Sequence, residues 1–278
     1  SYRVNETAKI IHPGYFNATL KEIVQNTSDT KTYVFEAEKP FYFRAGQYLT
    51  VGCKVGDSYV ARPYAISSAP KAALNKQVAV TVKKCGFFSG YLFDKAVVGD
   101  VFTLGDPSGE FCFEPVKDSK NVLAIAGGSG ITPFYSMAQS IKDGTSDFSM
   151  TILYGAKTEK DIIFKSELDA LASDKIKVVY VLSDEKKDGF EHGFISADII
   201  KKYVSGDFTV MMCGPQAMYS FLDKELKEFN LPLKRVKKEA NCVGMRDVKE
   251  TEYKLTVHIG FDKYEIKALS TETVLTAM

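Results

Sequence analysis

Short runs of alternating apolar and polar residues occupy the first part of the chain. Each run has the period of two that is typical of a strand with one buried face. The predicted strands lie at residues 17–27, 31–38, 47–55, 77–84 and 100–107. Because turn residues separate these strands and little helix intervenes, the pattern predicts a small antiparallel barrel or sandwich.

A different pattern begins near residue 117. Four apolar runs without polar alternation are separated by stretches of helical periodicity. These runs lie at residues 121–127, 148–156, 176–183 and 207–214. They predict a parallel sheet covered by helices on both faces. We therefore expect a β-barrel domain at residues 1–116, an α/β domain at residues 117–245 and a separate segment at residues 250–278.

Composition narrows the class of protein. The 278 residues are 45% hydrophobic and 26% charged, with a net charge of +1. This balance argues against a nucleic-acid partner, and no apolar run is long enough to cross a membrane. The five cysteines are scattered without CxxC spacing, which favours reduced thiols and a cytoplasmic location. The three histidines are far apart, so we expect no metal site.

The sequence "LAIAGGSGITPF" at residues 123–134 joins a predicted buried strand to a predicted helix. Gly127, Gly128 and Gly130 would let a phosphate approach the backbone, and Thr132 is expected to cap the helix. The amide groups of a helix start can then hold the phosphate. A tight turn without a ligand explains the same glycines, and this stretch alone does not separate the two.

A second strand end has the same design. The apolar run that ends at Cys213 and Gly214 is followed by Pro215 and an amphipathic helix. The two strand ends are expected to face one crevice of the parallel sheet, where the small thiol of Cys213 could lie against a flat ring. The alternative for Cys213 is an ordinary buried cysteine of the core.

The barrel half carries its own set of candidate residues. Arg62 and Tyr64 share one face of a predicted strand, where a guanidinium could hold a phosphate and a ring could stack on a planar ligand. In "KKCGFFSGYLF", Gly86 comes three residues before Ser89, which is expected to cap a second helix that could bind an anion.

Together these motifs resemble the ferredoxin–NADP reductase family. Arg62, Tyr64 and Ala65 fall on the family's Arg-x-Tyr-Ser flavin motif, and the turn at 86–89 falls on its Gly-x-x-Ser phosphate motif. Four further segments match family signatures: "FRAGQYLTV", "GDPSGEF", "GGSGITP" and "CGP". The resemblance covers residues 16–240 in the family's order. It implies an antiparallel flavin-binding barrel followed by a Rossmann-like nicotinamide-dinucleotide domain.

The resemblance implies transfer of a hydride from the nicotinamide to the flavin, which then releases electrons singly. Ala65 replaces the serine that approaches flavin N5 in the family, so its backbone N–H is expected to serve N5; Ser67 is a possible substitute. FAD is expected, with FMN as the alternative. The implied catalytic residues are Ala65 and Cys213. The implied cofactor-binding residues are Arg62, Pro63, Tyr64, Ala65, Ile66, Ser67, Val82, Lys83, Gly86, Phe88, Ser89, Gly128, Gly130, Thr132, Ser183, Asp184, Cys213, Gly214 and Pro215.

The choice of nicotinamide cofactor depends on the residues after the strand at 176–183. Ser183, Asp184 and Glu185 suit the free ribose hydroxyl of NADH, because an acidic pair repels a 2′-phosphate. Lys186 and Lys187 follow and leave NADPH open. We expect NADH.

The expected electron acceptor is a ferredoxin-like iron–sulfur protein or domain. One alternative is an electron-transfer subunit similar to those of dihydroorotate dehydrogenase or bifurcating transhydrogenases, which carry a cysteine-rich loop where this chain has Cys242 alone. Another is a binding module that has lost the flavin, for which Ala65 is the only indication.

Two alternating runs at residues 254–260 and 263–269 predict a β-hairpin, and Thr271 is expected to cap a following helix. This order resembles the opening of a plant-type ferredoxin domain, in which cysteines that hold a [2Fe–2S] cluster come next. We expect the chain to be part of a protein that continues into such a domain. The alternative is a hairpin that serves as an ordinary structural appendage.

Overall fold

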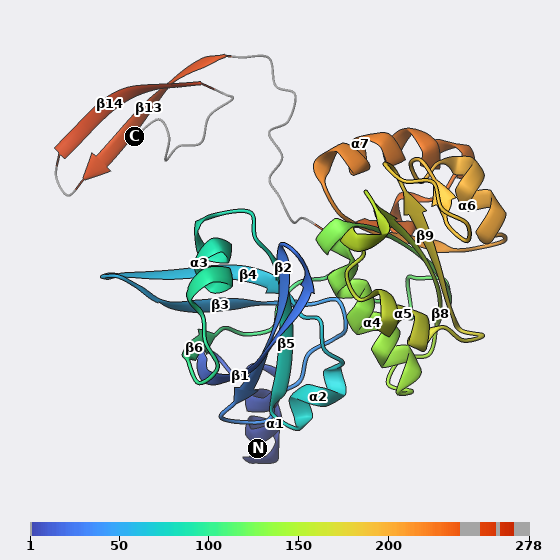
Figure 1. Cartoon of the computed structure of the whole chain (residues 1–278). Coiled ribbons are helices and arrows are strands. Elements are labelled where there is room, and N and C mark those ends of the chain that lie inside the picture. Colours follow the sequence, from blue (N-terminus) through green and yellow to red (C-terminus); the bar gives the residue numbers. More distant parts are fainter. Residues whose placement is uncertain (1, 240–250, 260–261, 270–278) are drawn as a thin grey trace. The chain divides into compact units, whose positions relative to one another are not determined.

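The structure is a computed structural model that describes residues 2–239, 251–259 and 262–269. It contains two larger sheets and a separate hairpin (Figure 1). Residues 1–241 and 242–278 form two units. The turn of the predicted hairpin at 260–261, Cys242, and the helix predicted after Thr271 lie outside the described residues.

The first sheet is antiparallel and has the strand order β4-β3-β6-β1-β2-β5. Ile66, just after β4, forms a bridge with Val80 of β5 and thereby closes the sheet into a barrel. The prediction of a barrel is therefore confirmed. The elements of this part are α1 (Tyr2–Ile11), β1 (Phe16–Thr27), β2 (Thr30–Ala37), β3 (Tyr48–Val55), β4 (Ser58–Ala65), α2 (Pro70–Leu74), β5 (Gln77–Lys83), α3 (Phe87–Lys95) and β6 (Val101–Leu104).

The second sheet is parallel and has the strand order β10-β9-β8-β7-β11-β12. Its strands are β7 (Asn121–Gly127), β8 (Ser149–Ala156), β9 (Ile176–Leu182), β10 (Glu191–His192), β11 (Thr209–Cys213) and β12 (Val236–Lys238). The longer helices are α4 (Thr132–Lys142), α5 (Lys165–Leu171), α6 (Ala197–Tyr203) and α7 (Gln216–Glu225). Short 3₁₀ turns are η1 (Gly128–Ile131), η2 (Glu159–Asp161), η3 (Leu226–Phe229) and η4 (Leu233–Arg235).

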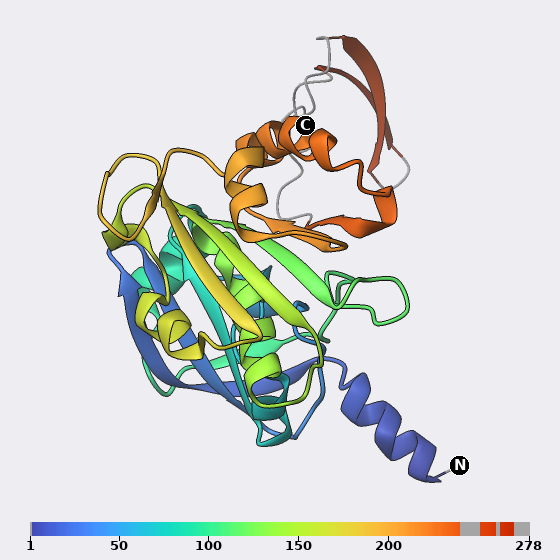
Figure 2. The same cartoon turned by 90° about the vertical axis from the view of Figure 1, so that its right-hand side faces the viewer.

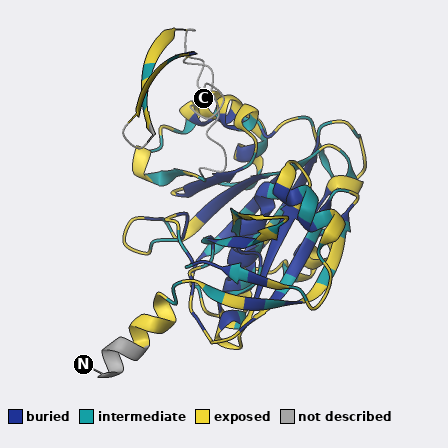
Figure 3. Ribbon diagram, turned by 90° about the vertical axis from the view of Figure 1, so that its left-hand side faces the viewer, coloured by how far each residue is buried: buried dark blue, intermediate teal, exposed yellow. Residues whose placement is uncertain are grey.

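Helices cover both faces of the parallel sheet, as the unbroken apolar strands predict (Figure 1). One core cluster joins the sheet to α4 and α5, and another joins its opposite face to α6 and α7. The barrel has a third core cluster of its own. Figure 3 shows the central strands of the parallel sheet largely buried, whereas Figure 2 shows α1 projecting away from the barrel. The predicted boundary near residue 117 falls between β6 and β7, and the division into domains stays a prediction.

The hairpin consists of β13 (Glu252–Ile259) and β14 (Asp262–Leu269), paired antiparallel from Glu252↔Leu269 to Ile259↔Asp262. Among the described residues, no helix is long and apolar enough to span a membrane.

Candidate functional site

The strand that carries the predicted flavin motif lies at an edge of the antiparallel sheet. Arg62 is exposed, and its guanidinium donates a hydrogen bond to the Ala61 carbonyl oxygen at 2.7 Å. Arginine has five N–H donors, so most of the guanidinium N–H groups remain available to a phosphate. Tyr64 is half-buried against the barrel core, and burial raises its pKa to about 12. Pro63, between them, is exposed.

The backbone of β4 offers a donor at Ala65. Ile66 donates its N–H to the Gln47 carbonyl oxygen at 2.9 Å, whereas Tyr48, which lies opposite Ala65, exchanges hydrogen bonds with Ser108 on its other side. Because bonded and non-bonded pairs alternate along an antiparallel ladder, the N–H of Ala65 points away from β3, to the side on which the next residue, Ile66, bridges to Val80 of β5.

The turn before α3 has a different cap from the predicted one. Gly86, not Ser89, is the N-cap residue, so the prediction that Ser89 caps the helix is wrong. The Ser89 hydroxyl instead accepts hydrogen bonds from the N–H groups of Cys85 and Gly86 at 3.0 and 2.9 Å. The first helical amides, from Phe87 onward, therefore remain directed out of the helix start, where an anion can bind.

Several predicted cofactor-binding residues of the barrel have side chains that are buried or paired within the barrel. Ile66, Val82 and Phe88 lie in the barrel core, so only their backbone could reach a cofactor. The Lys83 ammonium pairs with Asp29 at 3.1 Å. Ser67 is 1% exposed, and its hydroxyl has no hydrogen-bond partner among the described residues.

The parallel sheet brings the two predicted strand ends together. β7 and β11 are neighbours, with Ala126 opposite Cys213. The strand order reverses between them, since β8 and β9 follow on one side and β11 lies on the other. Such a switch point is where open α/β sheets bind ligands, at the carboxyl ends of the strands.

The glycines at this edge have two separate purposes. A Cβ on Gly130 would lie 1.9 Å from the Cys213 carbonyl oxygen. With any larger residue at position 130, the turn after β7 could not lie as close to the end of β11 as it does. Gly128 instead has a φ of +54° with nothing within 4 Å of an added Cβ. Gly130 is thus required by packing, and Gly128 leaves an open left-handed turn to which a ligand has access.

The start of α4 also differs from the prediction. The 3₁₀ turn η1 precedes the helix, Ile131 is the N-cap residue, and the Thr132 hydroxyl donates to the Ser129 carbonyl oxygen at 2.8 Å. The prediction that Thr132 is the N-cap is therefore wrong. Pro133 does lie in the first helical turn, as expected.

Two tyrosines that sequence reasoning missed hold these strand ends. The Tyr154 hydroxyl donates to the Gly128 carbonyl oxygen at 3.0 Å and accepts from the Ile163 N–H at 3.1 Å. The Tyr219 hydroxyl accepts from the Gly214 N–H at 3.1 Å. The sequence did contain a signal for these contacts. A tyrosine in a buried strand or on a buried helix face indicates a hydrogen bond to another part of the chain, because a buried hydroxyl needs a partner.

Cys213 is buried, at 1% exposure, in the core cluster that includes α4. Gly214 is half-buried and Pro215 is exposed as the N-cap residue of α7. The structure therefore brings Cys213, Gly214 and Pro215 beside the Gly128 turn, at the same edge of the sheet.

The residues after β9 form a polar group of their own. The Ser183 hydroxyl donates to the exposed Asp184 carboxylate at 2.6 Å. Glu185 accepts from the Glu159 N–H at 2.9 Å, and Lys187 pairs with the Glu159 carboxylate. The Asp184 carboxylate is thus exposed, whereas Glu185 and Lys187 are both engaged with Glu159.

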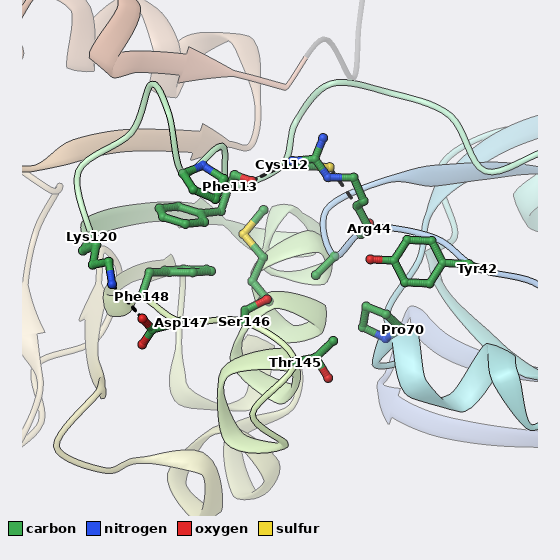
Figure 4. Close-up of a pocket in the computed structure, with 13 residues that line it drawn as sticks. Tyr42, Arg44, Pro70, Cys112, Phe113, Lys120, Thr145, Ser146, Asp147 and Phe148 are labelled. Atoms are coloured by element: carbon green, nitrogen blue, oxygen red, sulfur yellow. Dashed lines mark hydrogen bonds and ion pairs between the residues drawn. The ribbon is translucent and has the colours of Figure 1, made fainter. Parts of the chain in front are cut away.

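A cavity of about 410 Å³ lies elsewhere, between the barrel and the loop before β8 (Figure 4). Its lining includes Tyr42, Arg44, Lys120 and Phe148. Lys120 precedes β7 and Phe148 precedes β8, so the cavity faces the amino ends of these strands. We therefore place no nucleotide in it. Among the described residues no cluster of His, Cys, Asp or Glu could hold a metal ion.

Comparisons with known proteins agree with this architecture. Residues 17–113 match the family described as "Oxidoreductase FAD-binding domain", and residues 124–224 match "Oxidoreductase NAD-binding domain". The chain is 30% identical over 238 residues to NADH-cytochrome b5 reductase 2 of Candida albicans, covering 79% of this chain and 77% of that protein.

Two further matches come from bacteria. The glycine betaine monooxygenase reductase subunit of Chromohalobacter salexigens is 26% identical over 247 residues, covering 85% of this chain and 67% of that protein. The FAD/NAD-binding domain of a Vibrio cholerae nitric oxide dioxygenase has the same fold, with a TM-score of 0.73 and 20% identity over 81% of this chain and 98% of that one. The chain therefore belongs to the ferredoxin–NADP reductase family and is an NAD(P)H-dependent flavoprotein reductase that binds FAD and NADH.

Proposed function

We propose that this chain is the reductase component of an electron-transfer system, which oxidises NADH and delivers single electrons to an iron–sulfur protein or domain. The observation that supports the cofactor arrangement most directly is that each sheet has an edge at which backbone amides of a helix start are available to a phosphate. One is the edge of β4 with the start of α3, and the other is the switch point between β7 and β11.

The residues at the first edge fit FAD. The exposed Arg62 guanidinium and the first amides of α3 are donors for phosphate oxygens. The half-buried Tyr64 ring offers a flat apolar surface, and the Ala65 N–H points away from β3. When bound there, FAD supplies the conversion between a two-electron hydride donor and one-electron acceptors.

The residues at the second edge fit NADH. The open turn at Gly128 gives a pyrophosphate access to the backbone next to α4, and the Tyr154 hydroxyl holds that turn in place. Asp184 accepts a hydrogen bond from a ribose hydroxyl, while its charge disfavours a 2′-phosphate. The Cys213 side chain is buried in the core cluster with α4, so this residue contributes to the site through its backbone, which packs against Gly130.

The same residues give this chain its role in the chemistry. Tyr64 orients a flat ring, Arg62 and the helix starts neutralise phosphate charge, and the Ala65 N–H donates toward N5 in place of a serine hydroxyl. Orientation of this kind accounts for much of the acceleration expected of a hydride-transfer site.

The iron–sulfur acceptor is the finer part of the proposal. Its support is the relative named as an oxygenase reductase subunit, together with the hairpin β13–β14. One face of that hairpin is apolar, with the cross-strand pairs Leu255↔Ile266 and Val257↔Tyr264. Two paired strands alone bury too little surface to be stable. We propose that this hairpin belongs to a ferredoxin-like acceptor domain.

Anaerobic titration of the FAD-loaded protein with NADH tests the acceptor. A [2Fe–2S] ferredoxin and a cytochrome b5 are supplied in parallel, with ferricyanide as a positive control. We expect NADH-dependent reduction of the ferredoxin. Reduction of the haem protein and ferricyanide without reduction of the ferredoxin would contradict the iron–sulfur acceptor and favour a haem acceptor.

A further inference from the structure

Helix α4 is fastened to the barrel by two side-chain hydrogen bonds. The Ser136 hydroxyl donates to the Ser68 carbonyl oxygen at 2.7 Å, and the Gln139 side-chain amide donates to the Ser67 carbonyl oxygen at 2.7 Å. We call these two donors and their two acceptor carbonyls the α4 latch. Figure 1 shows α4 on the side of the parallel sheet that faces the barrel.

The barrel side of the latch is itself held firmly. Ser67 donates its N–H to the Ala79 carbonyl oxygen at 2.8 Å, and the Ser68 hydroxyl accepts from the Ala79 N–H at 3.1 Å. Because Ser67 follows the flavin-motif strand β4 by two residues, a movement of these carbonyls would also move the end of that strand.

The helix side of the latch leads to the proposed dinucleotide site. Ser136 and Gln139 follow Thr132 by four and seven residues, so all three lie on one face of α4. A displacement of the latch is therefore transmitted along a rigid helix to the turn that begins at Gly128. The latch links the strand proposed to hold the flavin with the helix start proposed to hold the pyrophosphate.

Apolar and polar groups share the contact between the two halves of the chain: Phe111 of the barrel half packs against Phe134 of α4, and the latch adds two side-chain hydrogen bonds. The core of the barrel and the cores of the α/β part are separate clusters. A groove of about 250 Å³ runs beside the latch, lined by both polar residues, such as Asn26 and Glu167, and apolar residues, such as Phe164. Ser136 is 0% exposed and Ser67 is 1% exposed, so loss of a donor would leave a buried carbonyl without a hydrogen bond.

We propose that Ser136 and Gln139 are positioning residues, which set the position of the nicotinamide site relative to the flavin site. This inference rests on the proposed function. It does not require either side chain to touch a cofactor. Since a misplacement of about 1 Å between reacting groups costs on the order of 100-fold in rate, a partial loosening of the latch should cost about 10-fold.

The test compares the Ser136→Ala/Gln139→Ala double variant with Ser140→Ala. Ser140 is a matched control because it is buried on the same helix, but its hydroxyl donates to Met137 and Ser146 within the α/β part. The measurements are FAD content, the dissociation constant for NADH, and the limiting rate of flavin bleaching by NADH with its deuterium isotope effect. Hydrogen exchange of the amides at 66–69 and 132–142 is measured in FAD-free protein.

For the double variant we expect FAD content and NADH affinity near those of the wild type, a limiting rate about 10-fold lower, and faster exchange at 66–69. For Ser140→Ala we expect a rate within about twofold of the wild type. If the double variant does not fold, Gln139→Glu replaces the donor with an acceptor of the same shape and is expected to lower the rate.

Wild-type rates and wild-type exchange in a folded latch variant would overturn the inference. An equal loss in the latch and control variants would also overturn it, because the effect would then be general helix stability. A wild-type protein that takes no electrons from NADH would instead contradict the proposed function, while exchange in the FAD-free protein would still test the latch.

Discussion

Replacement of Gly130 by alanine should damage both stability and catalysis, because this glycine lies where two strand ends meet. The added Cβ would be 1.9 Å from the Cys213 carbonyl oxygen and 2.4 Å from its carbonyl carbon. Real Cβ contacts are essentially never shorter than 3.0 Å, and the obstructing atoms are backbone. The ends of β7 and β11 must therefore separate by at least about 1 Å.

The size of the effect follows from this displacement. Overpacking in a close-packed region costs about 1–3 kcal/mol, and the upper end applies because no flexible side chain can yield. At roughly 2–4 °C per kcal/mol for a unit of this size, the melting temperature should fall by about 6–12 °C. A shift of about 1 Å at the proposed nicotinamide site should lower kcat on the order of 100-fold.

Thermal unfolding and NADH-dependent ferricyanide reduction measure the two effects. Gly155→Ala is the matched control, because Gly155 lies at the same edge of the sheet on β8 and its added Cβ would have no contact closer than 3.6 Å. A Gly130→Ala protein with wild-type melting temperature and kcat would refute the reasoning. So would a Gly155→Ala protein that is damaged as much.

Three further predictions concern single side chains. Arg62→Ala should purify with little FAD, whereas Lys84→Ala, which removes a cation paired with Asp94, should keep it; yellow absorbance measures both. Asp184→Ala should lower the ratio of kcat/KM for NADH over NADPH by about 10-fold, and an unchanged ratio would contradict the ribose assignment. Burial raises the pKa of Glu239 from 4.5 to about 7. Between these two pH values the folded protein keeps a proton that the unfolded chain has lost, so the free energy of unfolding should decrease as the pH rises from 4.5 to 7. Urea midpoints should show this fall, and Glu239→Gln should flatten it.

The sequence predicts the fold well where periodicity alone decides the outcome. Period-two runs predicted barrel strands, and unbroken apolar runs predicted a covered parallel sheet. The buried face of α7 does not follow hydrophobicity alone. Phe221 is 37% exposed, whereas Tyr219 on the same helix is buried because its hydroxyl bonds to the end of β11. From hydrophobicity alone, a phenylalanine is expected to be more buried than a tyrosine. Here the order is reversed because the tyrosine hydroxyl has a hydrogen-bond partner on β11.

The two wrong N-caps have a common physical reason. A hydroxyl near a helix start can accept from helical amides or bond to another backbone group of the preceding turn, and the sequence pattern is the same for both. Ser89 accepts from amides that precede the helix, and Thr132 donates to a carbonyl of the 3₁₀ turn. The choice depends on the path of the turn, which no local pattern specifies.

Individual residues of the candidate site could be predicted from the sequence, but the long-range contacts between them could not. Gly128 was identified for ligand access, and the structure leaves its turn open. Gly130 was identified for the same purpose, yet its packing against Cys213 depends on a strand pairing that joins residues more than 80 positions apart. The α4 latch was not predicted either. Ser136 and Gln139 are two of several polar residues on α4, and their acceptors lie 68 and 72 positions away in the sequence, so no local pattern singles them out.

Under the proposed function, the departure from the family pattern at Ala65 leaves the chemistry in place. The missing serine hydroxyl removes one donor near flavin N5, but the register of β4 against β3 directs the backbone N–H of the same residue away from β3, where it is available to a ligand. A backbone donor is fixed by the ladder and needs no rotamer to be ordered, whereas a hydroxyl rotates. Replacement of the serine therefore removes a group that could also carry a proton but keeps one that orients the ring. Under this reasoning, the rate of this enzyme depends more on positioning than on proton transfer at residue 65, and positioning is what Gly130 and the latch provide.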